Sequence, residues 1–167
     1  MKTSIKHISL LCMLSLSITS CGIFGGITLK EDIETFEIRK FADNSKTVKP
    51  GLSERFSLKF EEHILNHTNL TYVTDNGHVV YQGEIIRFEN GPKRAGTSLS
   101  PKENRLIIGV RVIFTDTKDS ENNLQKVFTG HHDYDNGLAL IDVEEEAFKE
   151  IFQKIYDDIV DATILRW

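Results

Sequence analysis

Histidines at two places in the chain stand at spacings that could bind a metal ion. His63 and His67 are four residues apart, which brings two imidazoles to one side of a helix, and His131-His132 precede Asp133. The zinc-protease pattern needs Glu directly after the first histidine of such a pair, and the chain has none there. Adjacent residues on a strand point to opposite faces, so His131 and His132 cannot serve one site. We therefore expect His63 and His67 to face solvent, and no metal or other cofactor to be held.

The sequence offers no activated nucleophile for catalysis. No serine lies in a Gly-x-Ser-x-Gly turn. Of the two cysteines, Cys12 lies in an apolar leader and Cys21 follows it, where a different chemistry applies. We expect a protein that is not an enzyme, an expectation that a metal bound by Asp133 and one neighbouring histidine would overturn.

Cations gather in one loop of an otherwise acidic chain. Lys93, Arg94, Lys102 and Arg105 lie in residues 90–105, which are rich in Gly, Pro and Ser. Arg binds phosphate as a bidentate fork and Lys as a point charge, so this loop is a candidate contact for phosphate or for a phosphorylated lipid. The alternative is a solvated loop whose cations balance nearby acidic residues.

The N-terminus resembles the signal of a bacterial lipoprotein. Lys2 and Lys6 precede an apolar run over residues 8–18, too short to span a bilayer, and the run closes on Ile-Thr-Ser-Cys-Gly at Cys21. In such a signal the small residues admit the peptidase, and the thiol carries a thioether-linked diacylglycerol. The resemblance implies removal of residues 1–20 and lipidation of Cys21 with diacylglycerol and an N-acyl chain.

Lipidation sets where the mature protein is expected. Each buried methylene contributes about 0.8 kcal/mol, so several acyl chains hold a protein on a membrane that it does not span. Gly22 stands where an aspartate commonly retains lipoproteins in the inner membrane, so the resemblance favours the inner leaflet of the outer membrane. Residues 21–30 form the expected lipidated tether.

Composition limits the mature chain to one acidic domain. Removing residues 1–20 from 167 leaves 147 residues, and losing Lys2 and Lys6 leaves 18 Lys and Arg against 25 Asp and Glu, a net charge of −7. This length fits one core, expected over residues 31–167. The charge argues against nucleic acid as a partner. With Cys12 removed and Cys21 acylated, no disulfide is expected.

The first half of the domain combines two strand patterns with a helix. Residues 33–41 alternate as a half-buried strand. Ser53 is a candidate N-cap for a helix in which Leu52, Phe56, Phe60 and Ile64 recur at helical spacing. An extended segment over residues 70–85 turns at Asp75-Asn76-Gly77, and Gly83 indicates a bulge or close approach of the helix. A helix between the strands suits a parallel crossover.

The second half contains two strands and a long helix. Residues 106–114 alternate cleanly, with Ile107 and Ile113 in the outward row, so the second face of the sheet is a candidate for cover by a partner. A fourth strand is expected over residues 124–134 with Phe128 inward. A helix opens with Asp142 and Glu145 in capping-box spacing. Its apolar stripe is Phe148, Ile151, Phe152, Ile155, Ile159 and Ala162.

These elements predict an α+β domain in two layers. Their order is β-α-β-β-β-α, which packs two helices on one face of a four-stranded mixed sheet.

The order and spacing of several short motifs resemble the LptE family of lipopolysaccharide-assembly lipoproteins, in its Bacteroidetes-like form. The motifs are Phe41-Ala42-Asp43-Asn44, the segment from Gly77 to Ile85, Asn104-Arg105-Leu106, Phe128, Asp133-Tyr134-Asp135 and Trp167. His78, where similar sequences often carry an acidic residue, and the long basic loop depart from the pattern.

The resemblance implies a non-enzymatic plug and assembly partner of LptD, the outer-membrane β-barrel that delivers lipopolysaccharide to the cell surface. Lipopolysaccharide and the inner leaflet of the outer membrane are the other implied partners. Candidate contact residues are Lys93, Arg94, Lys102, Arg105, Ile107 and Ile113. The alternative is a periplasmic adaptor or binding lipoprotein of another envelope complex.

Overall fold

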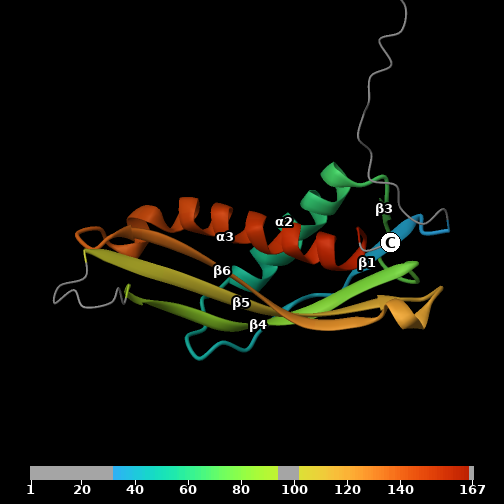
Figure 1. Cartoon of the computed structure of the whole chain (residues 1–167), viewed down its shortest axis with the longest axis horizontal. Coiled ribbons are helices and arrows are strands. Elements are labelled where there is room, and N and C mark those ends of the chain that lie inside the picture. Colours follow the sequence, from blue (N-terminus) through green and yellow to red (C-terminus); the bar gives the residue numbers. More distant parts are fainter. Residues whose placement is uncertain (1–31, 94–101, 166–167) are drawn as a thin grey trace, which may run out of the picture.

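Two helices pack on one face of a mixed β-sheet, which confirms the predicted α+β class (Figure 1). The computed structural model describes residues 32–93 and 102–165. Cys21 and Arg94 lie outside these residues. The elements are β1 Thr35–Ile38, β2 Ala42–Asp43, α2 Leu52–His67, β3 Thr71–Tyr72, β4 Val79–Pro92, β5 Glu103–Asp116, the 3-10 turn η1 Ser120–Asn122, β6 Leu124–Asp135 and α3 Leu140–Thr163.

Within the described residues the sheet has six strands, two more than the four predicted. Its order is β3-β1-β4-β5-β6, with β2 also paired to β4. β1 is parallel to β3 and to β4, as expected for a crossover through α2, whereas β4, β5 and β6 form an antiparallel meander. The extra strands β2 and β3 are two residues long, too short for a period of two to reveal them.

The predicted strand over residues 33–41 is interrupted because Phe41 turns into the core. Its ring lies 5.1 Å from that of Phe56, and it is 1% exposed. Gly83 makes room for it: a Cβ there would lie 2.8 Å from the Phe41 ring and 2.1 Å from the carbonyl oxygen of Arg111. Neither the predicted bulge nor the helix lies at Gly83: the register shift falls between Ile85 and Arg87, and the close neighbours are Phe41 and β5.

Helix α2 buries the predicted face but begins differently. Leu52, Phe56, Phe60 and Ile64 are all buried, which confirms the stripe. The prediction of Ser53 as N-cap is wrong, because the cap is Gly51 at φ 78°, a left-handed conformation that glycine adopts without strain.

Helix α3 starts before its predicted cap. Its first residue is Leu140, and the Asp142 carboxylate accepts a hydrogen bond from the Ala139 backbone N–H at 3.2 Å. Glu145 takes no part in capping. Its predicted stripe is buried apart from Ala162, which is partly buried. Gly130 of β6 lets α3 approach closely, since a Cβ there would lie 2.9 Å from the side chain of Ile151.

An aromatic cluster joins both helices to the sheet. The Phe56 ring contacts Phe41, Phe60, Phe152 and Tyr156. The buried Tyr156 hydroxyl donates to the carbonyl oxygen of Phe56 at 2.8 Å, and burial raises its pKa. In the described part of the chain, neither helix is long and apolar enough to cross a bilayer.

Candidate functional site

Within the described chain, no helix or strand covers the face of the sheet opposite the helices, although the loop before α2 borders it at Thr47 (Figure 1). Ile107 and Ile113 point to this face, as the alternation predicts, and both are half-buried. Each borders a shallow hollow. The hollow at Ile107 has a volume of about 810 Å³ and includes Arg87 and Arg105, and that at Ile113 is about 250 Å³ and includes Arg111.

Ion pairs lie on this open face, both between neighbouring strands and within one strand. Arg111 of β5 pairs with Glu84 of β4, and Arg87 pairs with Glu89 at 2.6 Å. Sequence reasoning missed Glu84, Arg87 and Arg111 as members of the surface. Alternation places Arg111 beside Ile113, but its pairing with Glu84 depends on the register of β4 against β5.

The predicted basic loop is largely neutralised by acidic neighbours. Arg105 donates to both carboxylate oxygens of Asp133, at 2.5 and 2.8 Å. Lys93 Nζ lies 2.8 Å from Asp133 and 2.6 Å from Glu103. Hydrogen bonds from Arg105 and then Lys93 hold the pKa of the Asp133 carboxyl well below its usual range. For these two cations, the structure favours the alternative in which loop cations balance acidic residues.

Of the other predicted site residues, Lys102 lies within the described residues, whereas Arg94 and Cys21 do not. Lys102 is exposed and forms no ion pair within the described residues, while its carbonyl oxygen accepts a bond from the Asn136 N–H at 3.1 Å. Arg94 and the lipidation site Cys21 lie outside the described residues, so their roles stay predictions. The structure therefore brings Lys93 and Arg105 together at one end of the open face, with Ile107 in the same hollow.

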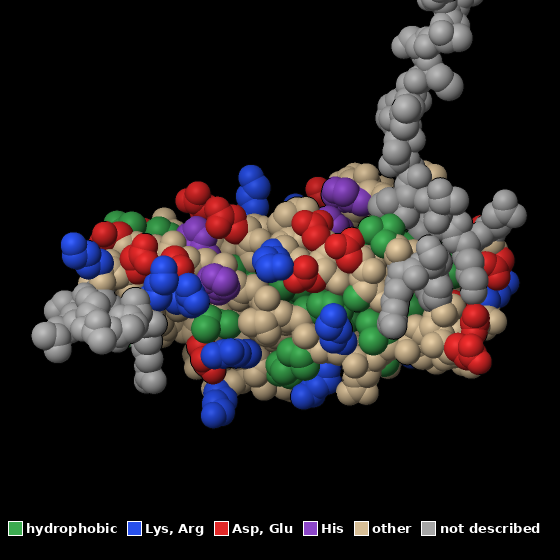
Figure 2. All heavy atoms as spheres, in the orientation of Figure 1, with side chains coloured by type: hydrophobic (Ala, Val, Ile, Leu, Met, Phe, Trp, Pro, Cys, Tyr) green, Lys and Arg blue, Asp and Glu red, His purple; other side chains and the backbone are tan. Residues whose placement is uncertain are grey.

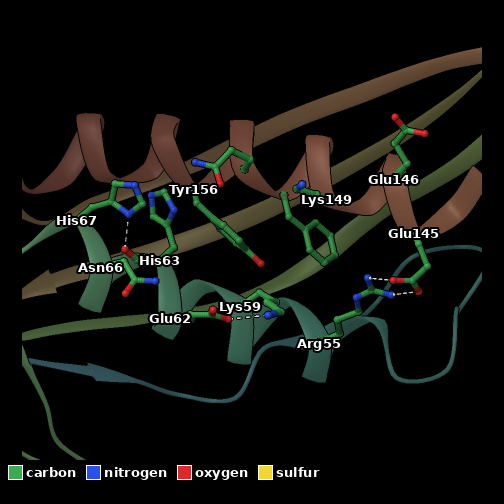
Figure 3. A pocket seen from close by; sticks show the side chains of 12 residues that line it. Arg55, Lys59, Glu62, His63, Asn66, His67, Glu145, Glu146, Lys149 and Tyr156 are labelled. Atoms are coloured by element: carbon green, nitrogen blue, oxygen red, sulfur yellow. Dashed lines mark hydrogen bonds and ion pairs between the residues drawn. The ribbon is translucent and has the colours of Figure 1, made fainter.

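A third hollow, of about 690 Å³, lies between α2 and α3 (Figure 3). Arg55 reaches across it and forms a fork with Glu145, at 2.6 and 2.5 Å. Glu145 is the sixth residue of α3, beyond the positions that cap the helix, and it pairs with α2 instead. His63 and His67 line the other end of the hollow.

The prediction that both helix histidines face solvent is wrong for His63, which is 5% exposed. Its ring stacks on that of His67 with centroids 4.1 Å apart, and its Nε2 lies 3.3 Å from Asp157. Burial and the neighbouring His67 lower the pKa of His63, although Asp157 opposes this. No three His, Cys, Asp or Glu side chains are grouped for a metal within residues 32–93 and 102–165.

His131 and His132 lie on opposite faces of β6, as predicted. His131 is exposed on the open side, whereas Nδ1 of His132 lies 2.7 Å from the Glu150 carboxylate of α3. Figure 2 shows acidic and basic side chains interspersed over the molecular surface in this view. Among the described residues, the surface offers paired charges and isolated apolar side chains for binding.

Comparison with solved structures shows the same fold in distant proteins. A protein from Xanthomonas campestris is 12% identical with a TM-score of 0.55, covering 80% of this chain and 88% of its own. A hypothetical protein from Chlamydia trachomatis is 10% identical with a TM-score of 0.53, covering 77% and 94%.

Sequence comparison identifies the family. No curated protein matches the chain. The family model for LptE, described as lipopolysaccharide-assembly, matches residues 33–163, which include every strand and both helices described above. The chain therefore belongs to the LptE family of lipopolysaccharide-assembly proteins.

Proposed function

We propose that this chain is a non-enzymatic outer-membrane lipoprotein, anchored through Cys21, that binds an LptD-type β-barrel and supports lipopolysaccharide transport. Membership of the LptE family implies a role in lipopolysaccharide assembly. The observation that carries the finer proposal is the open sheet face, where half-buried Ile107 and Ile113 lie among ion pairs. The helices cover the other face, so this one is available to a partner.

The charge arrangement of this face suits a polar barrel wall. Charges that lose water on docking are costly unless they are already paired, and removing one partner leaves an uncompensated charge. Here Glu84, Arg87 and Asp133 each have a partner on the same face before any docking. Ile107 and Ile113 can then act as apolar anchors inside a polar rim, the usual anatomy of an interface.

The barrel contact is tested by pull-down from detergent-solubilised outer membranes. Ile107→Glu with Ile113→Glu is expected to abolish stoichiometric co-purification of the barrel. The matched control is Leu58→Glu, which changes an exposed leucine on the outer side of α2 and is expected to retain the barrel. If the double variant folds with unchanged stability and still retrieves the barrel, the open face is not the contact.

The same pull-down separates this function from that of a periplasmic adaptor in another complex. Only the proposed function expects one LptD-type barrel in stoichiometric amount. Consistent recovery of a different envelope assembly, without the barrel, would favour the adaptor.

The basic loop is tested with a charge-reversal variant, Lys93, Arg94 and Lys102 each to Glu. If the loop binds the barrel or lipopolysaccharide, this variant loses barrel assembly or lipid binding. Unchanged co-purification and unchanged lipid binding would remove the loop from the site. The open-face variants provide the comparison, because their effect does not depend on loop charge.

We further propose that Cys21 serves only as the membrane anchor. A Cys21→Ala variant exported by a different, non-lipoprotein signal should stay soluble and still bind the barrel. Loss of barrel binding together with the lipid would assign the acyl chains a part in the interface.

A further inference from the structure

One edge of the sheet is a long strand with no neighbour within the described chain. β6 is the last strand in the sheet order and has 12 residues, whereas β3 at the opposite edge has two. In an antiparallel pair, alternate residues of an edge strand direct their backbone N–H and C=O groups away from the partner. Within residues 32–93 and 102–165, only the β5 ladder reaches the backbone from Lys126 to Thr129. This edge can therefore accept another strand.

A hollow of about 420 Å³ lies between this edge and helix α3. Its strand wall is Lys126 to Thr129, and its helix wall is formed by Asp158, Asp161 and Ala162. α3 runs beside β6 (Figure 1), held close by its contact with Gly130. A strand edge flanked by a helix is a geometry that binds extended peptides, with backbone hydrogen bonds giving affinity and side-chain pockets giving specificity.

The walls of the hollow define the chemistry of its occupant. The Asp158 side chain is 41% exposed and forms an ion pair with Lys154 on the same helix. Asp161 is exposed and has no ion pair in the described part of the chain. Lys126 is turned over the Phe128 ring, 5.1 Å from its centroid. Val127 is 46% exposed and points to the open face, so it can contact the side chains of an added strand that face away from α3. An acidic wall beside a free strand edge fits an extended segment that carries Lys or Arg.

We propose that the β6–α3 hollow binds a basic, extended segment of a partner protein as an added strand, with a cationic side chain facing Asp158 and Asp161. The proposal is separate from barrel docking, because it uses the sheet edge rather than the open face. A second copy of the chain fits less well, since dimerisation through β6 would bring two acidic walls of a protein of net charge −5 together.

The test uses the full mature protein in detergent and a fluorescent peptide, acetyl-Thr-Lys-Val-Lys-Thr-Val-Thr-amide, in an anisotropy titration. We expect saturable binding that Asp158→Asn with Asp161→Asn weakens about two- to tenfold, the range of two exposed ion pairs. Glu146→Gln is the matched control, because it removes an exposed acid from the same helix outside the hollow, and it should leave the affinity unchanged.

A second peptide separates strand addition from charge attraction alone. The same sequence N-methylated at every backbone amide keeps its lysines but cannot donate to a strand edge, and we expect it not to bind. Equal binding of both peptides, no saturable binding, or an equal loss in Glu146→Gln would each overturn the proposal. If sedimentation shows a dimer that Thr129→Lys disrupts, a second copy of the chain is the occupant, and this result would also overturn the proposal.

Discussion

Replacement of Gly83 by alanine tests whether the close packing of β4 against β5 and Phe41 requires a residue without a Cβ atom. A Cβ at this position would lie 2.1 Å from the carbonyl oxygen of Arg111 and 2.8 Å from the Phe41 ring. Real Cβ atoms are not found at such distances, so β4 must move away from β5 or from the core. We expect Gly83→Ala to lower the free energy of unfolding.

The magnitude follows from which atom is in the way. Overpacking a core costs about 1–3 kcal/mol. Here the nearer obstacle is backbone in the strand pair β4 and β5, which moves only by disturbing its hydrogen bonds, so we expect about 3 kcal/mol. For a domain of this size that corresponds to a fall in Tm of about 6–12 °C.

Urea denaturation followed by far-UV circular dichroism measures the loss. The control is Gly91→Ala on the same strand, where a Cβ meets nothing within 4 Å, so stability should be unchanged or raised by about 0.5 kcal/mol. Adding Phe41→Leu to Gly83→Ala should not restore stability, because the Arg111 carbonyl remains. A loss below about 0.5 kcal/mol in Gly83→Ala would refute the steric argument.

Three further substitutions test other contacts. The folded pKa of His63 lies below its ordinary 6.5, so the unfolded chain binds the proton more readily and stability should fall as pH drops below 6.5. His63→Gln should flatten this pH dependence in urea denaturation at pH 5 to 7, and an unchanged dependence would assign it to other groups. Asp133→Asn removes the carboxylate that holds Arg105 in an ion pair. If the loop is a phosphate site, lipopolysaccharide binding in a low-salt co-sedimentation assay should tighten about two- to fivefold. Weaker binding would count against that site. Gly130→Ala should destabilise the fold by about 1–3 kcal/mol in thermal unfolding, because the added Cβ meets both the side chain and the carbonyl oxygen of Ile151, and no loss would show that α3 can shift freely over β6.

Local patterns were sufficient for the fold class and for the faces of the elements. The alternation from Leu106 to Phe114 predicts which side chains are buried, and the helical spacing of Leu52, Phe56, Phe60 and Ile64 predicts one face of α2. The structure confirms both because each pattern lies within one element, where the direction of a side chain follows from the backbone period. The interruption at Phe41 was not predictable this way, since it depends on space provided by Gly83.

The sequence by itself determined the family, the two-layer architecture and the outward direction of Ile107 and Ile113. Only the tertiary structure decided that Asp133 neutralises Lys93 and Arg105, that His63 is buried, and that one edge of β6 has no neighbouring strand among the described residues. These outcomes depend on contacts between residues far apart in the chain, such as the 28 positions that separate Arg105 from Asp133. Strand register and helix packing set such contacts, and no local period specifies them.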